Sequence, residues 1–189
     1  LDQDEKADIA IVGAGFCGLS TALHLAERGH KVVVLEAKEA GFGGSGRNGG
    51  QVIPGLKYDP SELKTKLGAE RGQRLVDFAS STADTVFDLI ERHQLNVPYV
   101  RKGWIQGSHN AEALVSAQRR TRDWQQQGVA ARLLDKAQAA ELLGTDKYLG
   151  GWEDPRGGGI PPLSYTRELA RVAMEKGVRI YTESPATQL

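Results

Sequence analysis

The chain has little sulfur and no excess of charge of either sign. Its 189 residues include one cysteine and one methionine, and 24 basic residues balance 24 acidic ones. A single cysteine excludes a disulfide within the chain and fits a reducing compartment, so we expect a cytoplasmic protein. The balanced charge provides no general attraction to nucleic acid or to an acidic membrane surface, and we expect neither as a partner.

Long apolar runs and clusters of metal ligands are also missing. The most apolar stretch, residues 9–26, is interrupted by three glycines and by His24, so no membrane span is expected. The four histidines are scattered, and no group of His, Cys, Asp and Glu has the spacing of metal ligands. No residues have the arrangement of a nucleophile with its base or of a carboxylate dyad. Catalytic residues therefore stay unassigned, and no metal is predicted.

The chain does contain a glycine-rich turn between a strand and a helix. Residues 9–12 form a short apolar run that is typical of a buried parallel strand. Gly13, Gly15 and Gly18 follow in the pattern G-x-G-x-x-G, and apolar residues then recur at helical spacing. Such glycines permit a sharp turn, a close approach of pyrophosphate to the backbone and close packing of helix on strand. We predict that the first helical turn binds the phosphates of a dinucleotide.

An acidic residue stands at the position that binds the adenosine ribose in such sites. Residues 31–35 predict a second strand, and Glu36 follows it directly. A carboxylate there accepts hydrogen bonds from ribose hydroxyls and repels a 2′-phosphate, which favours FAD or NAD over NADP. A glycine-rich turn in an unrelated α/β protein is the alternative, and it leaves Glu36 unexplained.

Cys17 lies inside the glycine motif, and two interpretations are open. A helix N-terminus can activate a thiol, which would give Cys17 a reactive role. The interpretation that we favour is a small, buried packing residue at a variable position of the motif.

Residues 37–55 have a glycine density that is too high for a helix or an ordinary strand. They read AKEAGFGGSGRNGGQVIPG. A flexible linker is one alternative, but a linker has no need of Arg47, Asn48 and Gln51. Backbone N–H groups beside glycines form anion-binding concavities. We predict a loop wrapped around the cofactor, followed by a strand near residues 51–53. A plain surface cation is the alternative for Arg47.

The rest of the sequence predicts helices alternating with short strands. Apolar residues at 75, 78, 86 and 89, with Thr82 between them, predict one long helix over residues 69–94. Asp135 with Gln138 predicts a capped short helix that Gly144 ends. Further helices are expected over 111–127 and 164–176, and strands over 97–106, 131–134, 148–153 and 178–182.

Four segments together resemble the FAD-dependent oxidoreductases of the D-amino-acid oxidase type, which include glycine and sarcosine oxidases. Within that family the sequence is most similar to the γ-glutamylputrescine oxidoreductase branch. The segments are IVGAGFCGLSTALHLAERGHKVVVLEA, GFGGSGRNGGQV, GGGIPPLSYTRELARVAMEKGV and RIYTESPATQL. The resemblance departs at Pro161, which stands where the family often has a histidine.

The resemblance implies an α/β fold with a glutathione-reductase-type FAD-binding, Rossmann-like parallel sheet, interleaved with part of an α+β substrate domain. Residues 1–55 would form the FAD-binding βαβ unit and cofactor loop, residues 56–156 the inserted helical and substrate-side segment, and residues 157–189 the return to the FAD-binding domain. Family members are about twice this length, so the chain would be an N-terminal half that is inactive alone, and its own C-terminal half would be a partner.

The implied activity is oxidation of a C–N bond in a small amine or amino acid. A hydride would pass to flavin N5, the imine would hydrolyse, and O₂ would reoxidise the flavin. Some relatives attach flavin covalently through a histidine after the second strand, but no histidine lies between Lys31 and His93, so non-covalent FAD is expected. An NAD-dependent enzyme and a cofactor-binding module without turnover remain alternatives.

The resemblance also implies cofactor roles for three groups of residues. The pyrophosphate turn would comprise Gly13, Gly15, Phe16, Cys17 and Gly18. The adenosine would lie against Glu36, Ala37 and Lys38, with the backbone of Thr187 at the adenine edge. The loop toward the ribityl chain and isoalloxazine ring would comprise Ser45, Gly46, Arg47, Asn48, Gly49, Gly50 and Gln51.

Overall fold

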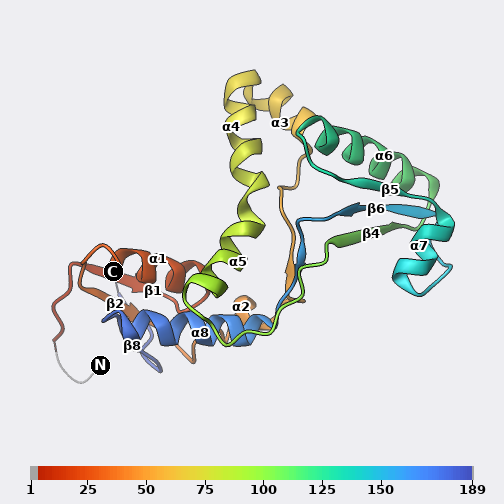
Figure 1. Cartoon of the computed structure of the whole chain (residues 1–189). Helices are drawn as coiled ribbons and strands as arrows, with labels where there is room; N and C mark the ends of the chain where they lie inside the picture. The colour runs from red at the N-terminus through yellow and green to blue at the C-terminus, as the bar shows by residue number, and fades with distance from the viewer. Residues whose placement is uncertain (1–3, 189) are drawn as a thin grey trace. The chain divides into compact units, whose positions relative to one another are not determined.

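The computed structural model describes residues 4–188, which fold as two compact units built from interleaved segments (Figure 1). The described part of the first unit comprises residues 4–50, 88–99 and 160–188. The second unit comprises residues 51–87 and 100–159.

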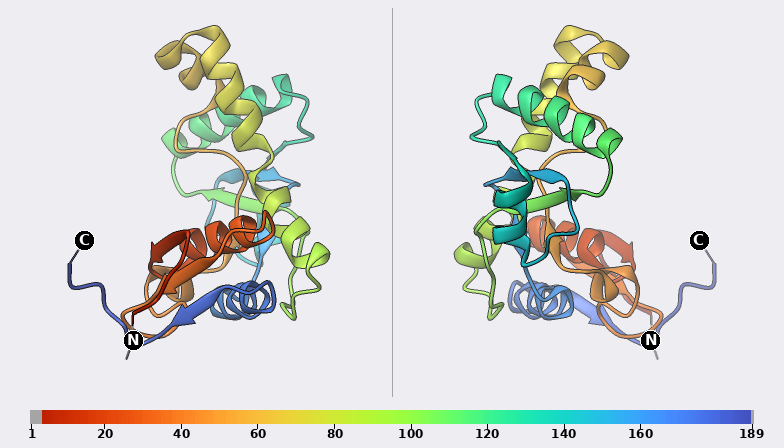
Figure 2. Two further views of the ribbon diagram at one scale, coloured as in Figure 1. Left: turned by 90° about the vertical axis from the view of Figure 1, so that its left-hand side faces the viewer. Right: turned by 90° about the vertical axis from the view of Figure 1, so that its right-hand side faces the viewer.

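The first unit is built on a three-stranded parallel sheet in the order β1–β2–β8. β1 (Ile9–Val12) pairs with β2 (Val32–Leu35), and β2 pairs with β8 (Arg179–Tyr181). The three valines of the middle strand β2 are buried, as expected for a parallel strand that is covered on both faces. Figure 2 shows this sheet from two sides. The parallel sheet confirms the predicted α/β class.

Two helices complete the first unit by packing against each other beside the sheet. They are α1 (Phe16–Ala26) and α8 (Pro162–Glu175). Their facing sides are fully buried, with Leu23 on α1 and Leu169 on α8 both 0% exposed. Pro162 occupies the first turn of α8, where its missing N–H costs nothing and its fixed φ fits the helix. The apolar residues that recur at helical spacing on α8 therefore pack against α1.

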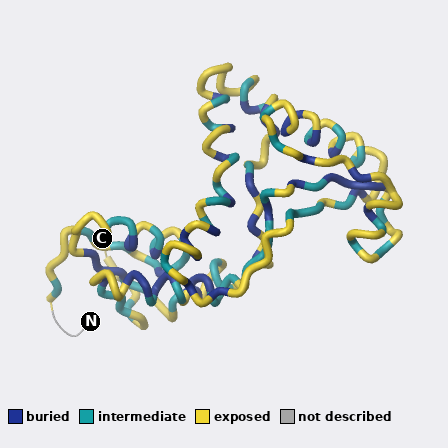
Figure 3. The backbone as a smooth tube through the Cα atoms, in the orientation of Figure 1, coloured by how far each residue is buried: buried dark blue, intermediate teal, exposed yellow. Residues whose placement is uncertain are grey.

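The second unit contains a three-stranded antiparallel sheet in the order β4–β6–β5. The strands are β4 (Trp104–Ser108), β6 (Gly150–Asp154) and β5 (Arg132–Leu134). Most of the middle strand β6 is buried (Figure 3). α6 (Ala111–Gln126) packs on this sheet, and the core between them contains Leu63, Val76, Ala117, Trp124, Ala131 and Trp152.

Smaller elements complete the second unit. β3 (Gln51–Val52) pairs antiparallel with β7 (Gly158–Gly159). α7 (Lys136–Leu143) begins at the predicted capping box, in which Asp135 accepts from the Gln138 N–H at 2.8 Å, and Gly144 ends it in the left-handed conformation. α3 (Pro60–Leu67) was not predicted, although Asp59 and Glu62 form a second capping box at its start.

The single helix predicted over residues 69–94 is wrong in two respects. The structure has two helices, α4 (Ala69–Ser80) and α5 (Thr82–Arg92), which are divided at Ser81. The predicted apolar stripe included Phe78, whose side chain is 67% exposed. Leu89 of the predicted stripe is buried, but the neighbouring stripe is buried along its whole length; it contains Val76, Ala79, Ala83, Phe87 and Ile90.

Two further predictions need correction. The strand expected over residues 97–106 is observed only as β4, which begins at Trp104 and continues two residues beyond the predicted end, to Ser108. A side chain at Gly107 would meet the ring of Tyr148 at 2.6 Å, so this glycine within the strand permits close packing. The glycine-rich loop, in which no helix was expected, contains the short α2 (Gly44–Arg47).

Candidate functional site

The turn between β1 and α1 requires glycine at its most crowded position. A Cβ atom at Gly18 would lie 2.0 Å from the carbonyl oxygen of Gly13 and 3.3 Å from Ile11 Cγ2. Gly13 itself has a φ of +101°, and its N–H donates to the Leu35 carbonyl at 2.8 Å. No atom lies within 4 Å of a Cβ built at Gly13, so this side of the turn is open. The turn thus combines tight helix–strand packing with free space beside the backbone.

Ser45 joins the glycine-rich loop to the start of α1. Its Oγ accepts a hydrogen bond from the Phe16 N–H at 3.0 Å, which satisfies one donor of the first helical turn. A Cβ at Gly15 would lie 2.8 Å from the same Oγ. The structure therefore brings the glycine turn before α1 and the glycine-rich loop, both predicted to bind the cofactor, together at one helix N-terminus.

The Glu36 carboxylate connects the same turn to the residues after β2. Oε2 accepts from the Ala14 N–H and Oε1 from the Lys38 N–H, both at 2.8 Å. A carboxylate has about four acceptor positions, so about two remain for a ligand. The backbone of Glu36 donates to Tyr181 and accepts from Ser184, which fixes it beside the end of β8.

Asn48 shapes the glycine-rich loop with its side chain. Nδ2 donates to the carbonyls of Gly44 and Ser45 at 3.0 Å each, and Oδ1 accepts from the Gly50 N–H at 2.8 Å. Gly50 has a φ of +70°, and a Cβ there would lie 2.0 Å from the Ile160 carbonyl oxygen. These contacts give Asn48 and Gly50 structural roles whatever the loop binds.

Arg47 carries the positive charge of this loop. Its guanidinium carbon lies 4.3 Å from the centroid of the Phe42 ring, a cation–π geometry, and both residues are exposed. No ion pair within residues 4–188 involves Arg47. Its charge is therefore available to an anion.

Two residues of α8 support this site, and sequence reasoning missed both. Tyr165 is buried with its ring centroid 5.5 Å from that of Phe16, and burial raises the pKa of Tyr165 to about 12. Thr166 is 0% exposed, and its hydroxyl lies 2.8 Å from the Pro162 carbonyl and 3.4 Å from that of Ser45. The only signal in the sequence was their place on the buried face of an amphipathic helix.

The remaining predicted site residues lie at the surface or outside this unit. Cys17 is exposed, so the expectation of a buried packing residue is wrong: the buried side of α1 contains Leu19, Ala22 and Leu23, and the helical period places Cys17 on the opposite side. Lys38 is exposed and pairs with Glu183 at 3.5 Å. Thr187 is exposed in the irregular stretch after β8. Gln51 begins β3 in the second unit.

Within residues 4–188, no group of three or more His, Cys, Asp and Glu residues is placed to hold a metal ion. In the same part of the chain, no helix combines the length and apolar character needed to cross a membrane.

Glu36→Gln is expected to destabilise the protein by about 1–3 kcal/mol even without ligand. The Ala14 and Lys38 N–H groups donate to different oxygens of the carboxylate, and the amide replaces one of these oxygens by an NH₂ group, so one donor loses its partner. Urea unfolding followed by circular dichroism measures the change. The control is Glu39→Gln, which removes only an exposed ion pair with Arg167. Equal unfolding free energies for the two variants would contradict this role of Glu36.

Comparison with known proteins relates these features to characterised families. A family model described as FAD dependent oxidoreductase matches residues 8–189. The probable oxidoreductase OrdL of Haemophilus influenzae is 35% identical over 193 residues, and gamma-glutamylputrescine oxidoreductase of Escherichia coli is 33% identical over 190 residues. Each alignment covers 100% of this chain and 44% of the relative. The chain thus spans less than half the length of these relatives.

Solved structures share the fold. Glycine oxidase from Geobacillus kaustophilus superposes with a TM-score of 0.76 at 23% identity, covering 95% of this chain and 47% of that protein. The structure of L-alpha-glycerophosphate oxidase from Mycoplasma pneumoniae, which has FAD bound, superposes with a TM-score of 0.76 at 19% identity. The superposition covers 98% of this chain and 47% of the oxidase chain.

Proposed function

The chain belongs to the family of FAD-dependent oxidoreductases, and on that premise we propose that it is the FAD-binding half of an enzyme that oxidises a C–N bond of an amine or amino acid. The family match over residues 8–189 carries this proposal. A relative at 33% identity is named for γ-glutamylputrescine, which is an amine. Because the chain covers 44% of that relative, the activity is proposed for the whole protein, with a C-terminal half as partner.

The residues of the first unit fit non-covalently bound FAD. The open side of Gly13 leaves room for a pyrophosphate beside the backbone, and Gly18 keeps the start of α1 close to that position. Glu36 has acceptor positions left for ribose hydroxyls, and a second negative charge such as a 2′-phosphate would be repelled there. The unpaired charge of Arg47 suits the phosphate-bearing side of the cofactor.

The remaining site assignments complete this proposal. Ser45 and Phe16 would hold the start of α1 near the pyrophosphate, and Lys38 would lie beside the adenosine. Glycines of the loop would let the flavin approach the backbone. The other proposed contacts are Gly15, Cys17, Ala37, Gly46, Asn48, Gly49, Gly50, Gln51 and Thr187.

These assignments give different segments of the chain different roles. Residues 1–55 and 157–189 would bind FAD, and residues 56–156 would contribute to the substrate side. Bound FAD would take up a hydride from the carbon beside the amine nitrogen and pass the electrons to O₂, leaving an imine that water hydrolyses. The chain's own residues would bind the cofactor, orient it and exclude water from it.

An absorbance spectrum of the purified whole protein, followed by acid precipitation, tests the proposal. We expect visible flavin bands that move to the supernatant, because no covalent bond holds the cofactor. An amine and amino-acid screen with peroxide detection should then show turnover. Saturation by NAD but not by FAD would overturn the cofactor assignment. Bound FAD that no amine or amino acid reduces would instead support a cofactor-binding module without turnover.

A further inference from the structure

The second unit contains a small cavity with a mixed polar and apolar lining, and it shares no residue with the proposed FAD site. Three of its lining residues, Gln106, His109 and Ser116, are exposed, so the cavity is accessible from solvent. Its volume is about 220 Å³, and it lies between the end of β4, the first half of α6 and Trp152 on β6. Its polar lining comes from Gln106, Ser108, His109, Ser116 and Arg120. We refer to it as the Ser108 cavity.

Ser108 is a buried side chain without a partner. The residue is 2% exposed, and strand alternation places it on the same face of β4 as Gln106 and Trp104, toward α6. Its hydroxyl makes no hydrogen bond to residues 4–188, whereas every fully enclosed polar side-chain atom of that range has a partner. The hydroxyl must therefore open on the cavity, where a buried polar group requires a hydrogen-bond partner.

The groups beside Ser108 are left as hydrogen-bond donors. Gln106 Oε1 already accepts from Trp152 Nε1 at 3.0 Å and from Arg120 Nη1 at 3.3 Å. The amide nitrogen of Gln106 and Nη2 of Arg120 make no hydrogen bond to the described residues. With both lone pairs of the Gln106 oxygen in use, this side of the cavity offers donors to a ligand.

The charge of the lining is positive. Arg120 is its one cation, and no carboxylate belongs to it. Asp59, which is 2% exposed, accepts from Arg120 Nε at 2.6 Å and from Arg119 Nη2 at 3.4 Å. One buried carboxylate is thus shared between two arginines, while it holds Arg120 in place through Nε. Donors around a fixed guanidinium select an anionic acceptor.

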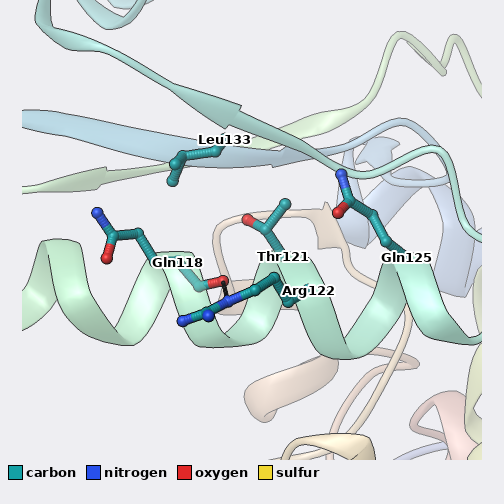
Figure 4. A pocket seen from close by; sticks show the side chains of 5 residues that line it. All are labelled: Gln118, Thr121, Arg122, Gln125 and Leu133. Carbon is teal, nitrogen blue, oxygen red and sulfur yellow. Dashed lines mark hydrogen bonds between the residues drawn. The ribbon is translucent and has the colours of Figure 1, made fainter.

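A second hollow on α6 differs from the Ser108 cavity, because its buried polar groups have partners within the protein. It lies between α6 and β5, lined by Gln118, Thr121, Arg122, Gln125 and Leu133 (Figure 4). Thr121 donates to the Ala117 carbonyl and Gln125 to the Ala131 carbonyl, both at 2.8 Å. Its buried polar groups are satisfied within the protein, so it has no need of a ligand.

We propose that the Ser108 cavity binds a small aliphatic carboxylate. The carboxylate would accept from the Ser108 hydroxyl, the Gln106 amide and Arg120, and the alkyl part would lie against the Trp152 indole. The cavity is smaller than the roughly 300–1,000 Å³ of sites for drug-sized ligands, which limits the ligand to a few carbons. This site is additional to the proposed oxidoreductase function and does not depend on it.

Sodium propionate is the probe, and the indole N–H of Trp152 reports on it. Because that N–H donates to Gln106 inside the cavity, its ¹⁵N–¹H resonance should shift on binding. The chain has three tryptophans, so three indole signals are resolved and assigned on the purified protein. We expect a saturable shift of the Trp152 signal with propionate and at least tenfold weaker binding of propionamide, its neutral isostere.

Two variants test whether propionate binds through the Ser108 hydroxyl rather than through a general effect of substitution on the protein. Ser108→Ala should weaken propionate binding about 10- to 100-fold, as expected for the loss of one hydrogen bond to a charged group. Arg122→Gln, an exposed change on the same helix, should leave binding unchanged. The proposal is overturned if propionamide binds equally well, if sodium chloride reproduces the shift, if the shift fails to saturate, or if Ser108→Ala binds as tightly as the parent.

Discussion

Gly18→Ala is expected to destabilise the protein by more than about 3 kcal/mol and to abolish FAD binding. The added methyl would lie 2.0 Å from the Gly13 carbonyl oxygen and 3.2 Å from its carbon. These are backbone atoms, so no side-chain rotation relieves the overlap, and α1 must move away from the turn. Such a movement displaces the first helical turn from the place where the phosphates would bind. The small gain in helix propensity from alanine, about 1 kcal/mol, is too little to offset this strain.

Far-UV circular dichroism during urea unfolding measures the stability, and a flavin fluorescence titration of the whole protein measures binding. Thr21→Ala is the matched control, because it lies on the exposed face of the same helix and exchanges one residue for alanine without overlap. We expect that control to change stability by at most about 0.5 kcal/mol. If Gly18→Ala unfolds within 1 kcal/mol of Thr21→Ala, roughly the error of two such measurements, the close approach of helix and turn is not required.

Asp154→Asn is expected to destabilise the second unit by about 3–5 kcal/mol. Asp154 is 0% exposed, and its carboxylate accepts from Arg156 Nε at 2.9 Å and from Nη2 at 2.5 Å. Arg156 also donates to Ser80 Oγ at 2.5 Å, and its guanidinium lies 4.4 Å from the Trp124 ring centroid. The asparagine variant would leave a largely buried guanidinium without its counter-ion, which costs more than the lost hydrogen bond alone.

Tryptophan fluorescence during urea unfolding follows this change, since Trp124 lies against Arg156. Glu70→Gln in the same unit is the control. The Glu70 and Arg74 side chains of that ion pair are 87% and 69% exposed, so the variant should lose only about 0–1 kcal/mol. A loss for Asp154→Asn no larger than that of the control would show that the Asp154–Arg156 pair does not stabilise the unit.

Some features were predictable because short segments determine them. The strand–turn–helix of the glycine motif depends on residues within a few positions of one another, and so does the cap of α7 at Asp135. The division of the long helix at Ser81 was not predictable, because both halves keep helical spacing across it. The burial of Val76 rather than Phe78 depended on which face met a neighbour, and two adjacent stripes had the same period.

The sequence by itself therefore determined the α/β class, the dinucleotide turn and Glu36 at the end of β2, since each follows from local backbone sterics and side-chain period. Tertiary structure alone decided which residues complete the site. Ser45 reaches Phe16 across 29 positions, and Thr166 reaches Ser45 across 121. The Ser108 cavity likewise exists only because α6 packs on β4. Contacts between distant segments depend on how whole faces of helices and sheets pack. The sequence of one segment does not specify which other segment will pack against it.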